Sequence, residues 1–154
     1  MAMTSKLKPY QKLQRYWRDT EARVSTVRLS AQAMDDLERK YGIDLPDDFA
    51  DYLLHSCPED DFAVDNNMTS WWPLDRIKSI PEEYQHESSD VTIARDAAKF
   101  LFFADYAIWC WAWAIACGGD NRGRVAVISG RDRFVADSFA QFVDVYIDDC
   151  RQLL

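Results

Sequence analysis

The sequence has little glycine and proline, and it lacks a long apolar run. Its 154 residues include 5 Gly and 5 Pro, with no low-complexity segment and no visible internal repeat, which argues against solenoids and propellers. The most apolar stretch, Phe100 to Cys117, is interrupted by Asp105 and falls short of a membrane span. The basic N-terminus is not followed by the apolar region of a secretory signal. We therefore expect a cytoplasmic protein that does not act in a membrane.

Residues suited to metal binding or catalysis are also scarce. The two histidines, His55 and His86, are isolated, and the cysteines form neither a Cys-x-x-Cys pair nor a zinc-type group with them. No His-Glu-x-x-His motif or EF-hand loop occurs, and the Gly-rich segment 118–123 lacks the Lys-Ser/Thr of a phosphate loop. We expect no metal, no cofactor and no enzymatic activity, with a small hydrolase as the weakest alternative. The cysteines are expected to be reduced thiols: Cys57, Cys110, Cys117 and Cys150.

What the chain does contain is apolar and acidic. It is 48% hydrophobic and 14% aromatic, enough for one packed core in a chain of this length. Residues 1–28 carry seven Lys/Arg against two Asp/Glu, whereas residues 29–65 carry two against eleven. Nucleic acid is a poor partner for such a chain, because phosphate binding needs a concentrated basic surface. A basic protein is the better electrostatic match.

The first half of the chain has helical patterns. Ser30 is a suitable N-cap and Gly42 a suitable C-terminal stop for a helix ending near Tyr41. Pro46 suits the start of a further helix that must end before Pro58. A basic helix over about Lys6 to Arg23 and a β-like stretch from Val24 to Leu29 precede them, and a long acidic loop from Glu59 to Asn67 follows them.

The second half alternates short strands with helices. A strand or edge at Trp71 to Leu74, a short helix near Asp75 to Ile80 and a helix near Val91 to Lys99 lead to strands over Phe100–Phe103, Ala107–Ala116, Arg124–Ser129 and Arg133–Ala136. A closing amphipathic helix begins near Ser138. Consecutive strands joined by short turns pair antiparallel, which predicts an α+β fold with a mostly antiparallel sheet flanked by helices. We assign residues 1–29 to a basic N-terminal extension or helix and 30–154 to a single domain.

Carboxylates are concentrated between residues 44 and 65. This acidic segment is one candidate for a partner-binding surface, because exposed charges accelerate the association of oppositely charged proteins. Solvated helix starts and polar loops are the ordinary alternative, and Asp47 and Asp48 also suit the positive end of a helix dipole. The acidic segment comprises Asp44, Asp47, Asp48, Asp51, Glu59, Asp60, Asp61 and Asp65.

Tryptophans are the second candidate for partner contacts. In an extended strand, Trp109, Trp111 and Trp113 would share one face, with Cys110 and small residues such as Ala112 on the other. A buried aromatic face would belong to the core, whereas a partly exposed one would supply interface anchors, and the pattern does not decide between them. Trp71 is included among the predicted contacts.

Four segments, in this order, resemble a known family. They are the helix before Gly42 with the following Ile43–Phe49 link, Trp72-Pro73-Leu74 with Ile77, Phe100–Asp105, and Val135–Phe142. On these motifs the chain resembles the SUKH superfamily, the Smi/Knr-type group, over about Ser30 to Leu154. It departs from the group after the Leu-Pro helix, where His55–Asp61 replaces the Asn-Gly or Gly-Gly that is common there.

The resemblance implies an immunity protein of the bacterial cytoplasm. Such a protein binds and neutralises a cognate toxin, commonly a nuclease or another toxin domain, and takes part in competition between bacteria. The alternative is a general protein-interaction or regulatory module of the same fold without a toxin partner.

Overall fold

A six-stranded antiparallel sheet forms the centre of the molecule. The structure is a computed structural model that describes residues 6–61 and 63–154. The strands lie in the sheet in chain order, from β3 at one edge to β8 at the other, and β1 and β2 form a separate antiparallel pair. The predicted α+β fold with an antiparallel sheet is confirmed. The strands are β1 (Thr26–Val27), β2 (Cys57–Pro58), β3 (Ala63–Val64), β4 (Thr69–Trp71), β5 (Phe100–Tyr106), β6 (Trp111–Ala116), β7 (Val125–Ile128) and β8 (Arg133–Ala136).

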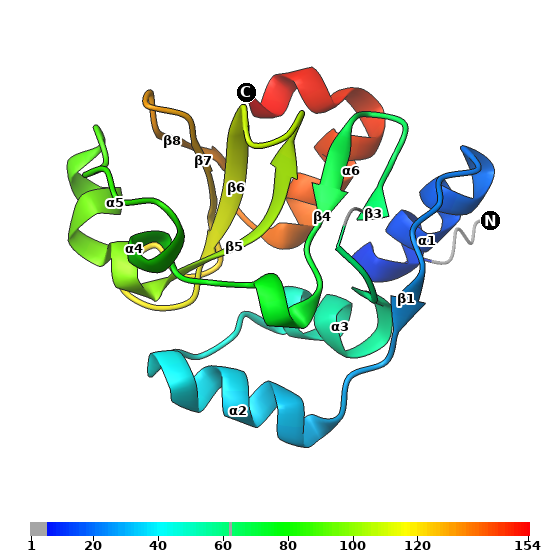
Figure 1. The fold of residues 1–154 in the computed structure, drawn as a ribbon, viewed down its shortest axis with the longest axis horizontal. Helices are drawn as coiled ribbons and strands as arrows, with labels where there is room; N and C mark the ends of the chain where they lie inside the picture. The colour runs from blue at the N-terminus through cyan, green and yellow to red at the C-terminus, as the bar shows by residue number, and fades with distance from the viewer. Residues whose placement is uncertain (1–5, 62) are drawn as a thin grey trace.

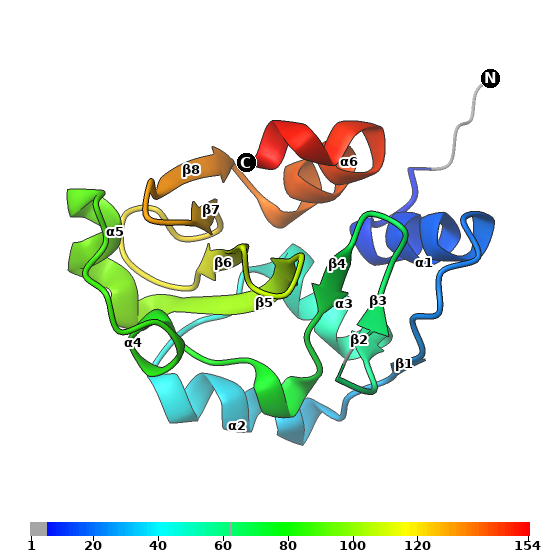
Figure 2. The same cartoon turned by 45° about the horizontal axis from the view of Figure 1, so that its top comes forward.

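Helices surround this sheet (Figure 1). Figure 2 shows α6 and α2 on opposite sides of the molecule, with α4 and α5 at one end and α1 at the other. The helices are α1 (Pro9–Asp19), α2 (Ala31–Tyr41), α3 (Asp47–Ser56), α4 (Ile80–Glu83), α5 (Val91–Asp96) and α6 (Phe139–Asp149), with the 3-10 turns η1 (Leu74–Arg76), η2 (Ala97–Lys99) and η3 (Cys150–Leu153).

Local sequence signals account for where these helices start and stop. The Ser30 side chain accepts a hydrogen bond from the backbone of Ala33, and Gly42 ends α2 with φ of 62°. At the start of α6, Ser138 caps the helix in the same way. Helix α3 ends at Ser56, two residues before Pro58, as expected from the restriction that proline places on the residue before it.

Aromatic rings join the sheet to α3 and α6. The ring of Phe103 on β5 lies 5.6 Å from Phe49 and 5.1 Å from Phe142, and Trp71 on β4 lies 5.1 Å from Tyr146. All five side chains are buried. Large aromatic surfaces removed from water are a major source of folding free energy, so this cluster holds α3 and α6 against one face of the sheet.

The basic N-terminal segment forms a shorter helix than predicted, α1, with Pro9 in its first turn. Leu13 and Trp17 are buried, and the Trp17 ring packs on Trp71 at 5.4 Å. Lys8 pairs with Asp51 of α3 at 3.3 Å. Segment 9–19 therefore packs into the core of the molecule, while the division of the chain at residue 29 stays a prediction.

The strand predicted over Ala107–Ala116 is wrong in its first part. Strand β5 continues to Tyr106, residues 107–110 form a turn, and β6 starts only at Trp111. Ala107, Ile108 and Trp109 all have positive φ, which is incompatible with an extended strand. Trp109 therefore does not share a strand face with Trp113.

Candidate partner-binding surface

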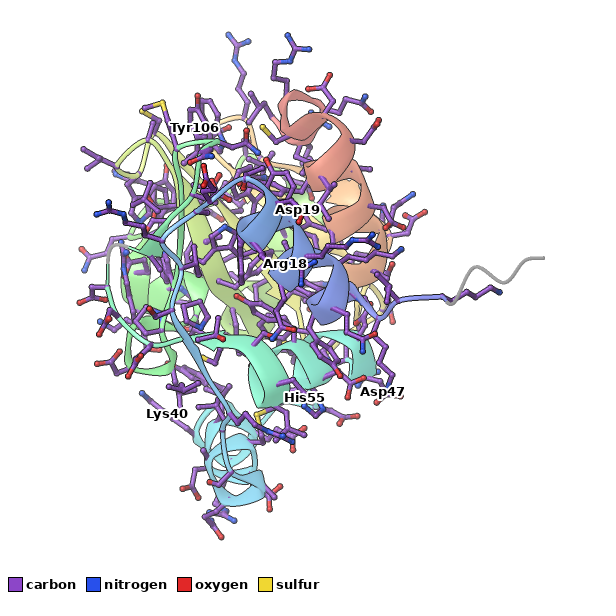
Figure 3. The ribbon with its side chains drawn as sticks, turned by 90° about the vertical axis from the view of Figure 1, so that its right-hand side faces the viewer. Arg18, Asp19, Lys40, Asp47, His55 and Tyr106 are labelled. Carbon is purple, nitrogen blue, oxygen red and sulfur yellow. The ribbon has the colours of Figure 1, made fainter. Side chains whose placement is uncertain are left out.

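The acidic residues of α3 differ in what they already contact. One Asp48 oxygen accepts from the backbone of Phe49, and the other accepts from the backbone of Ala140 at the start of α6, at 2.9 Å. Asp51 is paired with Lys8 of α1. Asp47 points outward at the start of α3 (Figure 3). The first turn of α3 thus uses Asp48 for structure and leaves Asp47 exposed to solvent.

Asp44 precedes α3 and faces the β6–β7 loop. Its carboxylate lies 3.4 Å from the Arg122 guanidinium, which also donates to the backbone carbonyls of Asp44 and Leu45. Exposed pairs of this kind contribute little to stability. The local positive charge of Arg122 nevertheless offsets the charge that Asp44 presents to a partner.

Glu59, Asp60 and Asp61 are exposed residues of the acidic segment, in addition to Asp44 and Asp47. All three side chains are open to solvent, and none forms an ion pair within the part of the chain that the structure describes. They follow β2, beyond the C-terminal end of α3, whose ten residues span about 15 Å. The eight predicted acidic residues therefore do not form one compact patch.

Asp65 is buried, which contradicts its prediction as a partner contact. Its carboxylate accepts hydrogen bonds from the indole of Trp71 at 2.9 Å, from the hydroxyl of Tyr146, and from the backbones of Asn67 and Thr69. Only 5% of the residue is exposed. A buried carboxylate needs such donors to offset its lost hydration, so Asp65 orders the β3–β4 turn from within.

Trp71 and Trp113 are also buried, and their prediction as interface anchors is wrong in this fold. Both are fully inaccessible. The Trp113 indole donates to the carbonyl of Leu153 at 2.9 Å, and its ring packs on Phe142 of α6. The sequence left open whether the aromatic face of β6 is buried or exposed. At Trp113 this face packs against α6 and belongs to the core.

Trp109 and Trp111 are half-buried and lie near the surface. Trp111 stacks on Tyr106 with ring centroids 4.3 Å apart. The Trp109 ring stacks on Tyr84, which follows α4, and its indole donates to Glu83 of α4 at 3.0 Å. Both remain candidates for partner contact. Trp109 lies in a turn and Trp111 is the first residue of β6, so the two do not belong to one continuous strand.

The turn that carries Trp109 is strained. Ala107, Ile108 and Trp109 have φ of 49°, 56° and 63°, and each left-handed residue that is not glycine costs roughly 1–2 kcal/mol. The backbone of Trp109 donates to Asp105 at 2.7 Å, and that of Cys110 donates to the carbonyl of Tyr106 at 2.8 Å. Without a glycine or asparagine in these four residues, the sequence offers no signal for such a turn.

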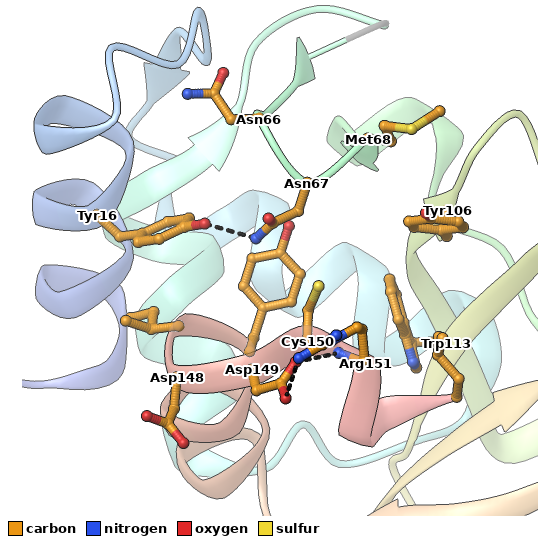
Figure 4. A pocket seen from close by; sticks show the side chains of 13 residues that line it. Tyr16, Asn66, Asn67, Met68, Tyr106, Trp113, Asp148, Asp149, Cys150 and Arg151 are labelled. Carbon is orange, nitrogen blue, oxygen red and sulfur yellow. Dashed lines mark hydrogen bonds and ion pairs between the residues drawn. The ribbon is translucent and has the colours of Figure 1, made fainter.

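A cleft lies between α1, the β3–β4 turn and the C-terminal end of α6 (Figure 4). It has a volume of about 380 Å³. Tyr16 accepts a hydrogen bond from the Asn67 side chain, and Asp149 pairs with Arg151 at 2.9 Å. The Arg151 guanidinium lowers the pKa of the Asp149 carboxyl by donating to it.

Cys150 is the one thiol in this cleft. Burial raises the pKa of Cys150, and the nearby charge of Asp65 raises it further. A nucleophilic cysteine requires a lowered pKa. The histidines lie elsewhere, His55 stacked on Tyr10 and His86 against Tyr84. No histidine is among the residues that line this cleft, so the Cys150 thiol has no imidazole base beside it there.

Metal-binding clusters and membrane-spanning helices are both absent from the described residues. Within 6–61 and 63–154, no group of three or more His, Cys, Asp or Glu side chains is placed to hold a metal ion. In the same residues, no helix has both the length and the apolar character needed to cross a membrane.

Comparison with known proteins identifies the family. No curated protein sequence matches the chain significantly. The model of the SMI1 / KNR4 family (SUKH-1) matches residues 28–145, which is more than half of the chain. The matched region contains α2 to α5 and the whole six-stranded sheet, and α1 lies outside it. The resemblance seen in the motifs is therefore confirmed, and the chain belongs to the SMI1 / KNR4 (SUKH-1) family.

Proposed function

We propose that this protein is an immunity protein that binds and neutralises a cognate bacterial toxin in the cytoplasm of the cell that makes it. The observation that supports the proposal most is membership of the SUKH-1 family, a family that includes immunity proteins. A cleft without an activated nucleophile is consistent with action by binding. The protein would act by occluding a surface that the toxin needs.

The exposed carboxylates favour a basic partner. Asp47, Glu59, Asp60 and Asp61 are exposed, and the chain carries a net charge of −8. Charges of one sign on a surface raise the association rate of an oppositely charged protein, and salt reduces the effect. Basic nuclease-type toxin domains fit this requirement, since they must bind phosphates.

Co-expression with the toxin domain encoded beside its gene tests the proposal. We expect the wild-type protein to protect the cell and to co-purify with the toxin. A toxin that still kills, and that does not bind the purified protein, would contradict the proposal. A general interaction module of the same fold is the alternative, and it predicts a partner without toxicity.

Charge reversal tests the electrostatic part. Asp60→Lys with Asp61→Lys should lower the association rate at low salt by tenfold or more, and the difference should shrink at high salt. The matched control is Asp35→Lys with Glu87→Lys, which makes the same charge change at exposed positions of α2 and of the segment between α4 and α5. Equal effects of the two double variants would show that only net charge matters.

A further inference from the structure

An apolar groove lies on the sheet face opposite α6. Val64, Ser70 and Asp105 are direct cross-strand neighbours on β3, β4 and β5, so their side chains share one face. Trp71, one residue further along β4, points to the other face and packs on α6 residues. The groove above this face has a volume of about 510 Å³ and is lined by Val64, Met68, Ser70, Arg76, Asp105, Ala107, Ile108 and Trp109.

Apolar side chains are exposed at this groove to an unusual degree. Val64 is 45% exposed, Met68 57% and Ile108 98%. Across the described residues, five large hydrophobic side chains are exposed in total, and these three line the same groove. Apolar side chains gathered in one place, unlike single scattered ones, mark interaction sites.

The two turns that carry Met68 and Ile108 are joined by a hydrogen bond. The backbone N–H of Ala107 donates to the carbonyl of Met68 at 2.9 Å, and Met68 itself has φ of 60°. Strained backbone persists only where surrounding contacts impose it, and such strain concentrates at functional positions. The groove is therefore held in shape before any partner arrives, which lowers the entropy lost on binding.

The charges around the groove select its occupant. On the floor, Arg76 lies 3.6 Å from Asp105 and covers the Trp72 ring at 4.1 Å, so its charge is neutralised. Asp61 precedes β3, and the three peptide steps between Asp61 and Val64 span at most about 11 Å. The exposed Asp61 is therefore within about 11 Å along the chain of Val64, which lines the groove, while the charge on the groove floor is neutralised.

We propose that this groove binds a segment of a partner protein in which an apolar side chain stands between lysine or arginine residues. The apolar side chain would contact Val64, Met68 and Ile108, and the basic residues would face Asp60 and Asp61. The identity of this partner as a toxin rests on the proposed function, whereas the chemistry of the segment does not. A second copy of the chain is the less suitable occupant, since it would bring two identical acidic rims together.

The test uses the full chain and two probes. The first probe is the neighbouring toxin domain, with Ile108→Asn compared with Val91→Asn, which changes another exposed β-branched residue on α5. We expect Ile108→Asn to raise Kd at least tenfold and Val91→Asn to change it less than twofold. If the toxin binds wild type and Ile108→Asn equally well, the groove inference is overturned while the proposed function stands.

The second probe needs no toxin. A blocked synthetic peptide with one leucine between lysine pairs is titrated into isotope-labelled protein, with a glutamate-flanked peptide as the control. With the lysine peptide, we expect saturable shifts of the Val64, Met68 and Ile108 amide signals of the wild-type protein. The glutamate-flanked peptide should bind the wild-type protein at least tenfold more weakly. The lysine peptide should likewise bind Ile108→Asn at least tenfold more weakly than wild type. Shifts centred elsewhere, or equal binding of both peptides, would refute the proposal. So would a wild-type dimer in light scattering that Ile108→Asn turns into a monomer.

Discussion

The indole of Trp71 donates a 2.9 Å hydrogen bond to the carboxylate of Asp65, and both residues are buried. Asp65 therefore belongs to the interior, although it ends a run of exposed acidic residues in the sequence. The Tyr146 hydroxyl, from α6, donates to the same carboxylate. Through these contacts one carboxylate links the β3–β4 turn to the terminal helix.

Tyr146→Phe should lower the free energy of unfolding by about 1–3 kcal/mol, because Asp65 would lose a donor while remaining buried. Burial raises the pKa of Tyr146 far above its ordinary value, and the charge of Asp65 adds to this, so the hydroxyl stays protonated and able to donate. Urea unfolding measures the change. Tyr10→Phe is the control, since no hydrogen bond of its hydroxyl is seen within the described residues. Equal losses in the two variants would contradict this role.

Ile108→Asn should stabilise the protein by up to about 1 kcal/mol. Asparagine tolerates the left-handed backbone better than a β-branched residue does, and the exposed Ile108 side chain loses no packing. Val91→Asn, in a right-handed helix, should stay within about 0.5 kcal/mol of wild type. Thermal and urea unfolding compare the three proteins. A destabilised Ile108→Asn would show that the turn is not strained in the way that its φ angles indicate.

Stability should fall as the pH rises above 9. Burial raises the pKa of Cys57 to about 12 and that of Cys117 to about 12, from an ordinary value of 9.0. Between pH 9 and 12 the unfolded chain therefore loses protons that the folded chain retains, and each thiol lowers the free energy of unfolding by roughly 1.4 kcal/mol per pH unit. Burial also raises the pKa of Tyr52, which acts in the same direction.

Urea unfolding at pH 8 and pH 10 measures this dependence. The double variant Cys57→Ala with Cys117→Ala should be less stable at pH 8 but should decline less by pH 10. An unchanged decline would mean that the thiols do not contribute. Thiol labelling at pH 8 gives an independent check, since exposed Cys110 should react long before the two buried cysteines.

Helix α1 should be needed for stability even though the family match begins at residue 28. Leu13→Ala should cost about 2–5 kcal/mol, because Leu13 is fully buried and its removal leaves a cavity. The exposed neighbour Gln14→Ala should change stability by less than about 0.5 kcal/mol. A Leu13→Ala protein as stable as wild type would support an N-terminal extension separate from the domain.

The sequence by itself determined the fold class, the family, the ends of α2 and α3 and the start of α6. Signals such as the Ser30 cap, Gly42 and Pro58 act within a few residues, so they are readable without tertiary structure. Short turns between consecutive strands likewise indicated the antiparallel sheet. These are local or periodic properties of the chain, and they do not depend on which elements meet in space.

Only the tertiary structure decided which acidic and aromatic residues reach the surface. Asp61 and Asp65 look alike in sequence, but Trp71 and Tyr146 surround the second and leave the first in water. Ile108 looks like a core residue, yet the contacts of Asp105 and Met68 hold it outward in a left-handed turn. Burial and backbone strain depend on neighbours distant in sequence, and no local pattern encodes them.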